Sequence, residues 1–417
     1  PWSHQLRGYH HLMALLNEHG GAAGLFAAMG VGKTKTLLDV IVNKGFRRIL
    51  VVCPLSVVTV WPMEVKRHAA APLHICTLAD GSVAKRSQAL QDAITAADAL
   101  KRPLLAVCNY QAFWREPLAG AILHGGFICV IFDEGHTLKA PAGVASRFAA
   151  RLSKRVPCRI AATGTPLPHS PGDAYGLYRA IGALWTLGVS SHAEFKAKYM
   201  ILGGYGGHET VGWRDLDDLH QRLYRIAFRV EAREALPDLP EAIHVERRGA
   251  LGAEGRRVYR ELEKQFISQV CGGVVTAANA LAKLLRLQQI TSGFIRLDEN
   301  SVDPLTALAQ MVMRLPSASQ GRIALAAGRD VPVDDTKRRL LAETLEELDP
   351  REPVVVIARF HHDLDTIHAV AKEMDRTSLE LSGRRKELEA WQEGAADVLA
   401  VQEDAGGLGV SMVRAHF

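Results

Sequence analysis

The chain has 417 residues, of which 48% are hydrophobic and 23% charged, and its formal net charge is +5. This length predicts two or three domains with sizeable cores, because single domains usually span roughly 100–200 residues. The sequence contains no run of about 18 apolar residues, so no membrane span and no membrane partner are expected. A net charge this small neither requires nor excludes nucleic acid as a partner.

The N-terminal residues and the cysteines indicate the compartment. The first residues lack both the basic and the apolar region of a secretion signal. The six cysteines lie at least 21 positions apart, which matches neither a metal-ligand spacing nor a disulfide framework. We therefore expect a cytoplasmic protein whose cysteines are buried and reduced.

The most informative segment is a glycine turn between an apolar strand and a helix. Residues 22–27 read as a buried strand, and residues 34–42 read as a helix that stops at a glycine. The backbone N–H groups of such a turn, with the positive end of the helix, form a cradle for phosphates. The Lys33 ammonium adds a point charge and the Thr34 hydroxyl can bind Mg²⁺. The candidate nucleotide-binding residues of this segment are Met29, Gly30, Val31, Gly32, Lys33, Thr34 and Lys35.

The first 165 residues alternate strand-like and helix-like segments. Short apolar runs at 49–53, 104–108, 127–132 and 159–162 are separated by helical stretches such as 83–97. Continuous apolar strands that alternate with helices indicate a parallel sheet covered on both faces. The expected fold class is therefore α/β.

The rest of the chain changes character twice. Residues 166–300 show helical periodicity at 174–187, 215–227, 254–270 and 277–289, few strand candidates, and a glycine-rich loop at 203–207. Two prolines, Pro237 and Pro240, follow Arg229 and predict the crossing between domains. From residue 335 the α/β rhythm returns, with helices at 336–348 and 362–374 and strands at 354–358, 378–381 and 398–401. Residues 317–333 read as a loop or insertion.

Two carboxylates follow the strand at 127–132. In α/β sheets, ligand groups sit at the carboxyl ends of the strands. We expect Asp133 to hold Mg²⁺, through water, and Glu134 to orient and deprotonate an attacking water. Both follow the phosphate loop by about 100 residues, the order typical of nucleotide hydrolases.

An ordered series of motifs resembles superfamily-two helicases and translocases. The phosphate loop, the segment at 53–56, Asp133-Glu134-Gly135-His136 and Thr163-Gly164-Thr165-Pro166 resemble their motifs I, Ia, II and III. Ala27, where the general phosphate-loop pattern has glycine, fits this superfamily. Further matches resemble the Swi/Snf type in particular: Trp61 and Glu64 after motif Ia, Leu236-Pro237-Asp238-Leu239-Pro240, residues 284–290, residues 356–360 (motif IV), and Gln402 with residues 405–410 (motif V).

This resemblance implies two RecA-like parallel-sheet lobes with helical insertions between them. The first lobe is expected at 1–235 with a helical insertion at 166–235, and the second at 236–417 with a helical start at 250–295. ATP and Mg²⁺ are the implied cofactors. The resemblance implies that Gln5 reads the adenine, that Gly407 and Gly409 contact the nucleotide, and that His136, beside the catalytic Lys33, Asp133 and Glu134, couples the two lobes. The expected nucleic-acid contacts are Ser56, Asn109, Arg359 and Gly406.

Resemblance to the Swi/Snf type also implies a DNA-stimulated ATPase that tracks on double-stranded DNA without separating its strands. The arginine-bearing motif VI is expected a few tens of residues after motif V, and the sequence stops at Phe417. We therefore expect either a piece of a longer protein, in a compact prokaryotic or viral form, or weakened hydrolysis. Two alternatives remain open: a strand-separating DNA helicase, and a nucleotide-gated DNA-binding switch with little turnover.

Overall fold

The structure is a computed structural model. It describes residues 2–204, 206, 209–238, 243–265, 267–270, 273–276, 280–297, 330–406, 412, 414 and 415. The chain divides into two compact units, the first spanning Pro1–Glu241 and the second beginning at Ala242, whereas the sequence placed the boundary after residue 235. Each unit is described by itself.

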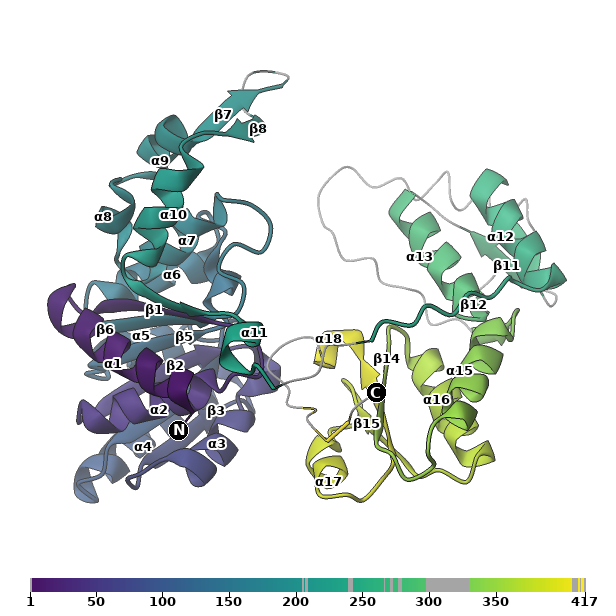
Figure 1. Cartoon of the computed structure of the whole chain (residues 1–417), viewed down its shortest axis with the longest axis horizontal. Helices are drawn as coiled ribbons and strands as arrows, with labels where there is room; N and C mark the ends of the chain where they lie inside the picture. The colour runs from purple at the N-terminus through teal and green to yellow at the C-terminus, as the bar shows by residue number, and fades with distance from the viewer. Residues whose placement is uncertain are drawn as a thin grey trace. The chain divides into compact units, whose positions relative to one another are not determined.

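The first unit is built on a seven-stranded sheet in which neighbouring strands all run parallel (Figure 1). The register pairs Asp133 with Ala162 and Phe26 with Thr163, so three strands end at the same edge. In sheet order the strands are β3 (His74–Leu78), β4 (Leu104–Asn109), β2 (Arg48–Cys53), β5 (Cys129–Asp133), β6 (Cys158–Thr163), β1 (Ala22–Ala27) and β9 (Ala227–Val230).

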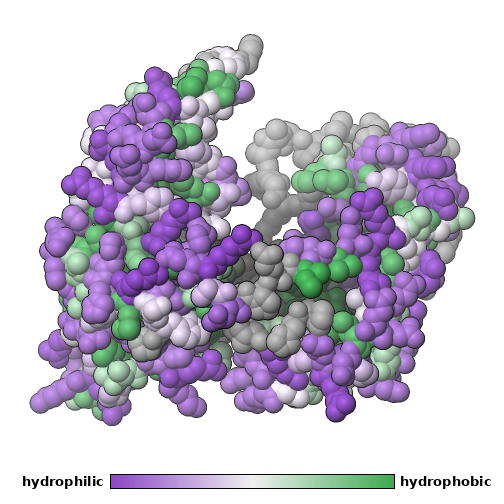
Figure 2. All heavy atoms as spheres, in the orientation of Figure 1, coloured by the Kyte–Doolittle hydropathy of each residue, from purple (hydrophilic) through white to green (hydrophobic). Residues whose placement is uncertain are grey.

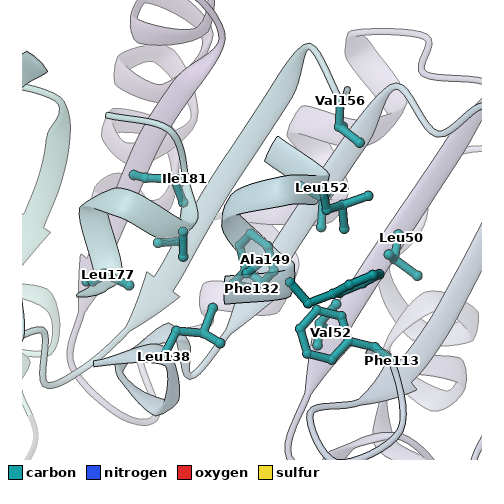
Figure 3. Close-up of a cluster of buried hydrophobic side chains, with 14 of the residues drawn as sticks. Leu50, Val52, Phe113, Phe132, Leu138, Ala149, Leu152, Val156, Leu177 and Ile181 are labelled. Carbon is teal, nitrogen blue, oxygen red and sulfur yellow. The ribbon is translucent and has the colours of Figure 1, made fainter. Parts of the chain in front are cut away.

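Helices cover both faces of this sheet, and side chains alternate between two cores. In β2, Leu50 and Val52 belong to one buried cluster, while Ile49 and Val51 belong to the other. Figure 3 shows part of the first cluster, where Leu152 and neighbouring helical side chains meet side chains of the strands. Because both faces are buried, the strands read as uninterrupted apolar runs, which confirms the parallel sheet expected from the sequence.

The helices of the first unit follow the strands in the order expected of an α/β fold. They are α1 (Ser3–Glu18), α2 (Lys33–Asn43), α3 (Val60–His68), α4 (Val83–Ala99), α5 (Leu118–His124), α6 (Val144–Ser153), α7 (Asp173–Ala180), α8 (Leu184–Leu187), α9 (His192–Tyr199), α10 (Leu216–Tyr224) and α11 (Ala232–Ala235), with short 3₁₀ turns η1 (Leu55–Val57) and η2 (Gly135–Leu138).

The region after β6 differs from the sequence prediction in three places. The helix expected at 174–187 is split into α7 and α8, because Gly182 adopts a left-handed φ of 67° that ends a helix. The helix expected at 215–227 ends at Tyr224, and the apolar residues that follow form β9 at the edge of the sheet. Strand β3 was not predicted at all, because only two of its five residues are buried and its apolar pattern is weak.

The glycine-rich loop joins two strands of an antiparallel hairpin. Strands β7 (Met200–Gly203) and β8 (Glu209–Trp213) pair with one irregularity between Ile201 and Leu202. The surface of the first unit is largely hydrophilic in the view of Figure 2, and hydrophobic colour gathers on this hairpin. Its exposed apolar side chains are Ile201, Leu202 and Val211.

The described part of the second unit contains a parallel sheet and two antiparallel pairs. The sheet has the order β14 (Val354–Ala358), β16 (Val398–Gln402) and β15 (Ser378–Leu381), and the pairs are β10 (Ile267–Val270) with β11 (Gly273–Thr276), and β12 (Phe294–Arg296) with β13 (Asp330–Pro332). The helices are α12 (Ala253–Gln265), α13 (Ala280–Thr291), α15 (Thr336–Glu347), α16 (His361–Glu373), α17 (Leu388–Gln392) and α18 (Glu403–Gly406).

The second unit thus confirms an α/β sheet after residue 335. It corrects the helix expected at 254–270, which ends at Gln265 and is followed by a strand. Of the predicted insertion at 317–333, residues 317–329 lie outside the described residues and 330–332 form β13. In the parts of the chain that the structure describes, every helix is too short or too polar to cross a bilayer.

Candidate nucleotide-binding site

The phosphate loop joins β1 to α2 at the carboxyl edge of the first unit's sheet. Gly30 and Gly32 have φ of 76° and 82°, values that favour glycine. A Cβ on Gly32 would also lie 2.2 Å from the Gln5 amide nitrogen, so a side chain at this position would have to displace the Gln5 amide from the loop. Gly32 is the residue before α2, and the first backbone N–H groups of that helix have no partner within the helix. This geometry binds anions.

The Lys33 side chain folds back beneath the loop. Its ammonium donates to the carbonyl oxygens of Ala27 at 3.2 Å and Ala28 at 3.5 Å, and lies 3.7 Å from a Glu134 carboxylate oxygen. The phosphate loop and the acidic segment that follows β5 are therefore joined through the Lys33 ammonium. Lys35, in contrast, is paired 2.5 Å away with Asp39 of its own helix.

The start of α1 lies against the same loop. Gln5 donates from its amide nitrogen to the Val31 carbonyl at 3.4 Å and accepts from the Trp2 backbone N–H at 2.9 Å. The buried His4 also contacts the Val31 carbonyl, at 2.8 Å through Nε2. Sequence reasoning identified Gln5 and missed His4. The sequence offered one indication of His4, which is that it directly precedes Gln5.

Asp133 is the last residue of β5 and is only 6% exposed. Its Oδ2 accepts a hydrogen bond from the Trp61 indole at 3.1 Å, and its Oδ1 accepts from the Glu134 backbone N–H at 3.1 Å. The Tyr110 hydroxyl donates to the Asp133 carbonyl at 2.8 Å. Trp61 and Tyr110 are thus positioning residues; the sequence singled out Trp61 as part of a motif without giving it a role.

Burial and, after it, the neighbouring Glu134 charge raise the pKa of Asp133 to about 6, against the opposing effects of Lys33 and the Trp61 hydrogen bond. The carboxylate therefore carries a charge that its protein partners compensate only in part. A bound cation would complete that compensation.

Glu134 follows in a left-handed conformation with φ of 50°. Its Oε2 accepts from the Thr163 hydroxyl at 3.2 Å and lies 3.4 Å from Nδ1 of His136. The Thr163 hydroxyl has one proton and donates it to Glu134. In the 2.9 Å contact with His136 the Thr163 oxygen must therefore accept, and Nδ1–H of His136 donates. Burial opposes ionisation of Glu134, but His136 and Lys33 lower its pKa below the ordinary value.

The oxygen atoms of this edge fit Mg²⁺ chemistry. Thr34 lies in the first turn of α2, is half-buried, and its hydroxyl has no hydrogen-bond partner among the described residues. Both Asp133 carboxylate oxygens keep an acceptor position beyond the single N–H that each receives. Mg²⁺ prefers such oxygen ligands and retains several waters beside phosphate oxygens.

The residues expected to contact nucleic acid lie in different surroundings. Ser56 is half-buried in η1. Asn109 is 4% exposed and its amide is used internally, accepting from Arg86 at 3.1 Å and donating to Gln111 at 2.8 Å.

In the second unit, Arg359 is exposed, with its guanidinium 5.9 Å from the Phe360 ring centre. Gly406 ends α18. Gly407 and Gly409 lie outside the described residues.

Comparison with known families and proteins identifies relatives of the chain. The model of the SNF2-related domain matches residues 4–292, more than half of the chain. A "Probable global transactivator" of Orgyia pseudotsugata multicapsid polyhedrosis virus is 28% identical over 162 residues, which cover 38% of this chain and 30% of that protein. "Putative protein p41" of Acyrthosiphon pisum secondary endosymbiont phage 1 is 26% identical over 310 residues, covering 70% of this chain and 65% of that protein.

The solved structures that align with this chain are more distant from it in sequence than these two relatives. The Sulfolobus solfataricus SWI2/SNF2 ATPase core in complex with dsDNA aligns with 99% of this chain and 80% of that chain, at 19% identity and a TM-score of 0.47. The Pyrococcus furiosus Hef helicase domain aligns with 97% of this chain and 86% of that chain, at 13% identity and a TM-score of 0.41.

Proposed function

Because this chain belongs to the SNF2-related family, we propose that it is an ATP-dependent motor that couples hydrolysis of ATP to movement on double-stranded DNA. The observation that carries the proposal is the meeting of Lys33 with Glu134, at 3.7 Å, where strands β1, β5 and β6 end. A phosphate loop and a catalytic carboxylate held this close serve phosphoryl transfer to water.

In this proposal the N–H groups at the start of α2 receive the β- and γ-phosphates of ATP. Lys33 exchanges its two carbonyl contacts for phosphate oxygens and keeps its electrostatic contact with Glu134. Thr34 and Asp133 hold Mg²⁺, which supplies the positive charge that neutralises the phosphates. Gln5, held against the loop at Val31, contacts the base.

Glu134 acts on the attacking water. Its lowered pKa keeps the carboxylate ionised, so that it can orient the water and accept one proton as the oxygen bonds to the γ-phosphorus and ADP leaves. Thr163 and His136 hold the carboxylate from its other side and fix its orientation. This arrangement makes His136 a positioning residue.

Contact with DNA is proposed along the residues that resemble the family's motifs. Ser56, Arg86, which the buried Asn109 holds at 3.1 Å, and Arg359 would meet phosphates of the backbone, which positions DNA without reading its sequence. Resemblance to the Swi/Snf type supports tracking along a duplex over strand separation.

The test is an ATPase assay of the protein as its gene encodes it, with no DNA, blunt duplex, forked duplex and single strand. We expect blunt duplex to stimulate hydrolysis, and displacement of a third strand from a triplex without unwinding of the fork. The matched control is Lys33→Ala, which removes the phosphate contact and should abolish the activity. ATP hydrolysis that no nucleic acid changes would refute the motor, and unwinding of the fork would replace it with a helicase.

A further inference from the structure

An open groove of about 1200 Å³ lies on the outer side of helices α6 to α9 in the first unit. It is lined by side chains of all four helices and of the turns between them, and it includes Arg159 near the beginning of β6. Thr163, beside the proposed catalytic Glu134, is at the other end of the same strand. At about 3.3 Å per residue these positions are about 13 Å apart, so the groove is distinct from the nucleotide site.

Helix α6 presents a row of cations to this groove. Its inner face, with Ala149 and Leu152, is buried in the core shown in Figure 3. Arg147, Arg151 and Lys154 follow one another at helical spacing on the opposite face, are exposed, and line the groove. None of the three has a carboxylate partner among the residues that the structure describes.

Five cations, Arg147, Arg151, Lys154, Arg159 and Arg179, line this groove against one carboxylate, and the stretch of sequence that supplies them is basic. Residues 139–199 contain nine Lys and Arg against two acidic residues, a surplus of 7, whereas the whole chain has a surplus of only 5. The single carboxylate in the lining, Glu194, accepts hydrogen bonds from the backbone and hydroxyl of Ser190. The groove is therefore a local anion-attracting surface in a chain that is otherwise nearly neutral.

An exposed aromatic face lies in the same groove. Trp185, on α8, is 49% exposed, and its ring is 5.9 Å from that of His19. His192 also lines the groove, with its ring 4.8 Å from the buried Tyr175. A large flat ring beside a row of cations offers a base a stacking partner while its phosphates meet the charges.

We propose that this groove binds single-stranded nucleic acid, with the phosphates along Arg147, Arg151 and Lys154 and a base stacked on Trp185. Duplex DNA keeps its base faces stacked inside the helix and cannot use the indole in this way. An acidic peptide would use the cations but has no planar base for the ring. The inference goes beyond the proposed motor, because it requires neither ATP nor the duplex contacts.

The experiment measures binding of labelled single strands of about 20 nucleotides, oligo-dT and oligo-U, in the absence of nucleotide, as a function of salt. Trp185→Ala should weaken binding roughly tenfold, and Trp185→Phe, which keeps an aromatic face, should retain most of it. Arg151→Glu with Lys154→Glu should weaken binding and reduce the slope of log affinity against log salt by about 1.4, or 0.7 for each lost phosphate contact. The oligo-dT and oligo-U arms distinguish DNA from RNA.

The matched control reverses two exposed cations elsewhere in the first unit, Lys85→Glu with Arg102→Glu, and should leave binding within about twofold and the salt slope unchanged. Binding of a fluorescent ATP analogue reports folding and should be unchanged in every variant. Wild-type affinity in both Trp185→Ala and the Arg151/Lys154 variant would overturn the proposal. An equal loss for blunt duplex would assign the groove to duplex DNA, and a loss confined to an oligo-glutamate probe would assign it to an acidic peptide; both outcomes also overturn it.

Discussion

Two buried carboxylates, one in each unit, have opposite surroundings. Asp133 ends β5 at 6% exposure and receives two N–H groups, one from Trp61 and one from the Glu134 backbone, beside the negative charge of Glu134 itself. Glu380 lies in β15 at 0% exposure and receives Arg384 Nε at 2.8 Å, His368 Nε2 at 3.1 Å and the Ser382 hydroxyl at 2.5 Å.

The difference appears in their acidity. Burial opposes ionisation of both groups, but the hydrogen bonds from Arg384, Ser382 and His368 lower the pKa of Glu380 to about 2, whereas the pKa of Asp133 is raised to about 6. A carboxylate whose charge is fully compensated anchors a fold. A carboxylate whose charge is compensated only in part is suited to bind a cation, because the cation supplies the positive charge that the protein does not provide.

The largest effect is expected at the carboxylate beside Asp133. Glu134→Gln removes the proton acceptor but keeps the side chain's shape, so kcat for ATP should fall by about 10³-fold while nucleotide binding persists. Steady-state hydrolysis and binding of a fluorescent nucleotide measure the two effects. The control is Glu18→Gln, an exposed residue at the end of α1, which should leave both unchanged. Retention of kcat in Glu134→Gln would remove this residue from the chemistry.

Glu380, the buried carboxylate of the second unit, should contribute to stability. Glu380→Gln leaves Arg384 and His368 without their anion, so local opening of β15 and α16 should become easier by about 2–4 kcal/mol. Hydrogen exchange of peptides covering 361–381 measures this change. The matched control in the same unit, Glu373→Gln, breaks an exposed pair with Arg338 and should cost less than about 1 kcal/mol.

The pH dependence of this stability difference separates the effect of charge at Glu380 from the effect of packing. A carboxylate with a depressed pKa stabilises the fold fully above its unfolded value of 4.5, and this contribution is lost as pH falls toward about 2. The difference between wild type and Glu380→Gln should therefore be constant near neutral pH and shrink below pH 4.5. A difference that does not change with pH would mean that packing, not charge, holds this cluster.

The sequence predicted the elements that carry a local pattern and missed those that depend on tertiary contact. Apolar strands such as β2 and β5 were found because both of their faces are buried, and the glycine turn around Gly32 was found because its backbone requires glycine. The two edge strands, the partly buried β3 and β9, were missed, since each is defined by pairing with a neighbour.

The same division holds at the candidate site. Lys33, Asp133 and Glu134 stood out because motif spacing marks them. The roles of His4, Tyr110 and Thr163 come from long-range hydrogen bonds that no local pattern reports. The cation groove had a compositional signal, the excess of Lys and Arg in residues 139–199, but only the fold places Trp185 beside it.

The smallest effect tests how much of the charge on Asp133 the protein compensates. Since the pKa of Asp133 is about 6, the association constant for the Mg²⁺–nucleotide complex should fall as pH drops through 6, because protonation removes the metal ligand. We call this fall the acidic limb of the binding curve. Nucleotide binding in EDTA, where Mg²⁺ is absent, should lack the acidic limb. Trp61→Phe removes the indole hydrogen bond that lowers this pKa, so the limb should move to higher pH by about one unit. Tyr110→Phe, whose lost bond is to the backbone carbonyl and not to the carboxylate, is the matched control and should leave the limb in place. An equal shift in both variants would assign the effect to general loosening of the core, and the indole hydrogen bond would then contribute nothing of its own to the compensation of the Asp133 charge.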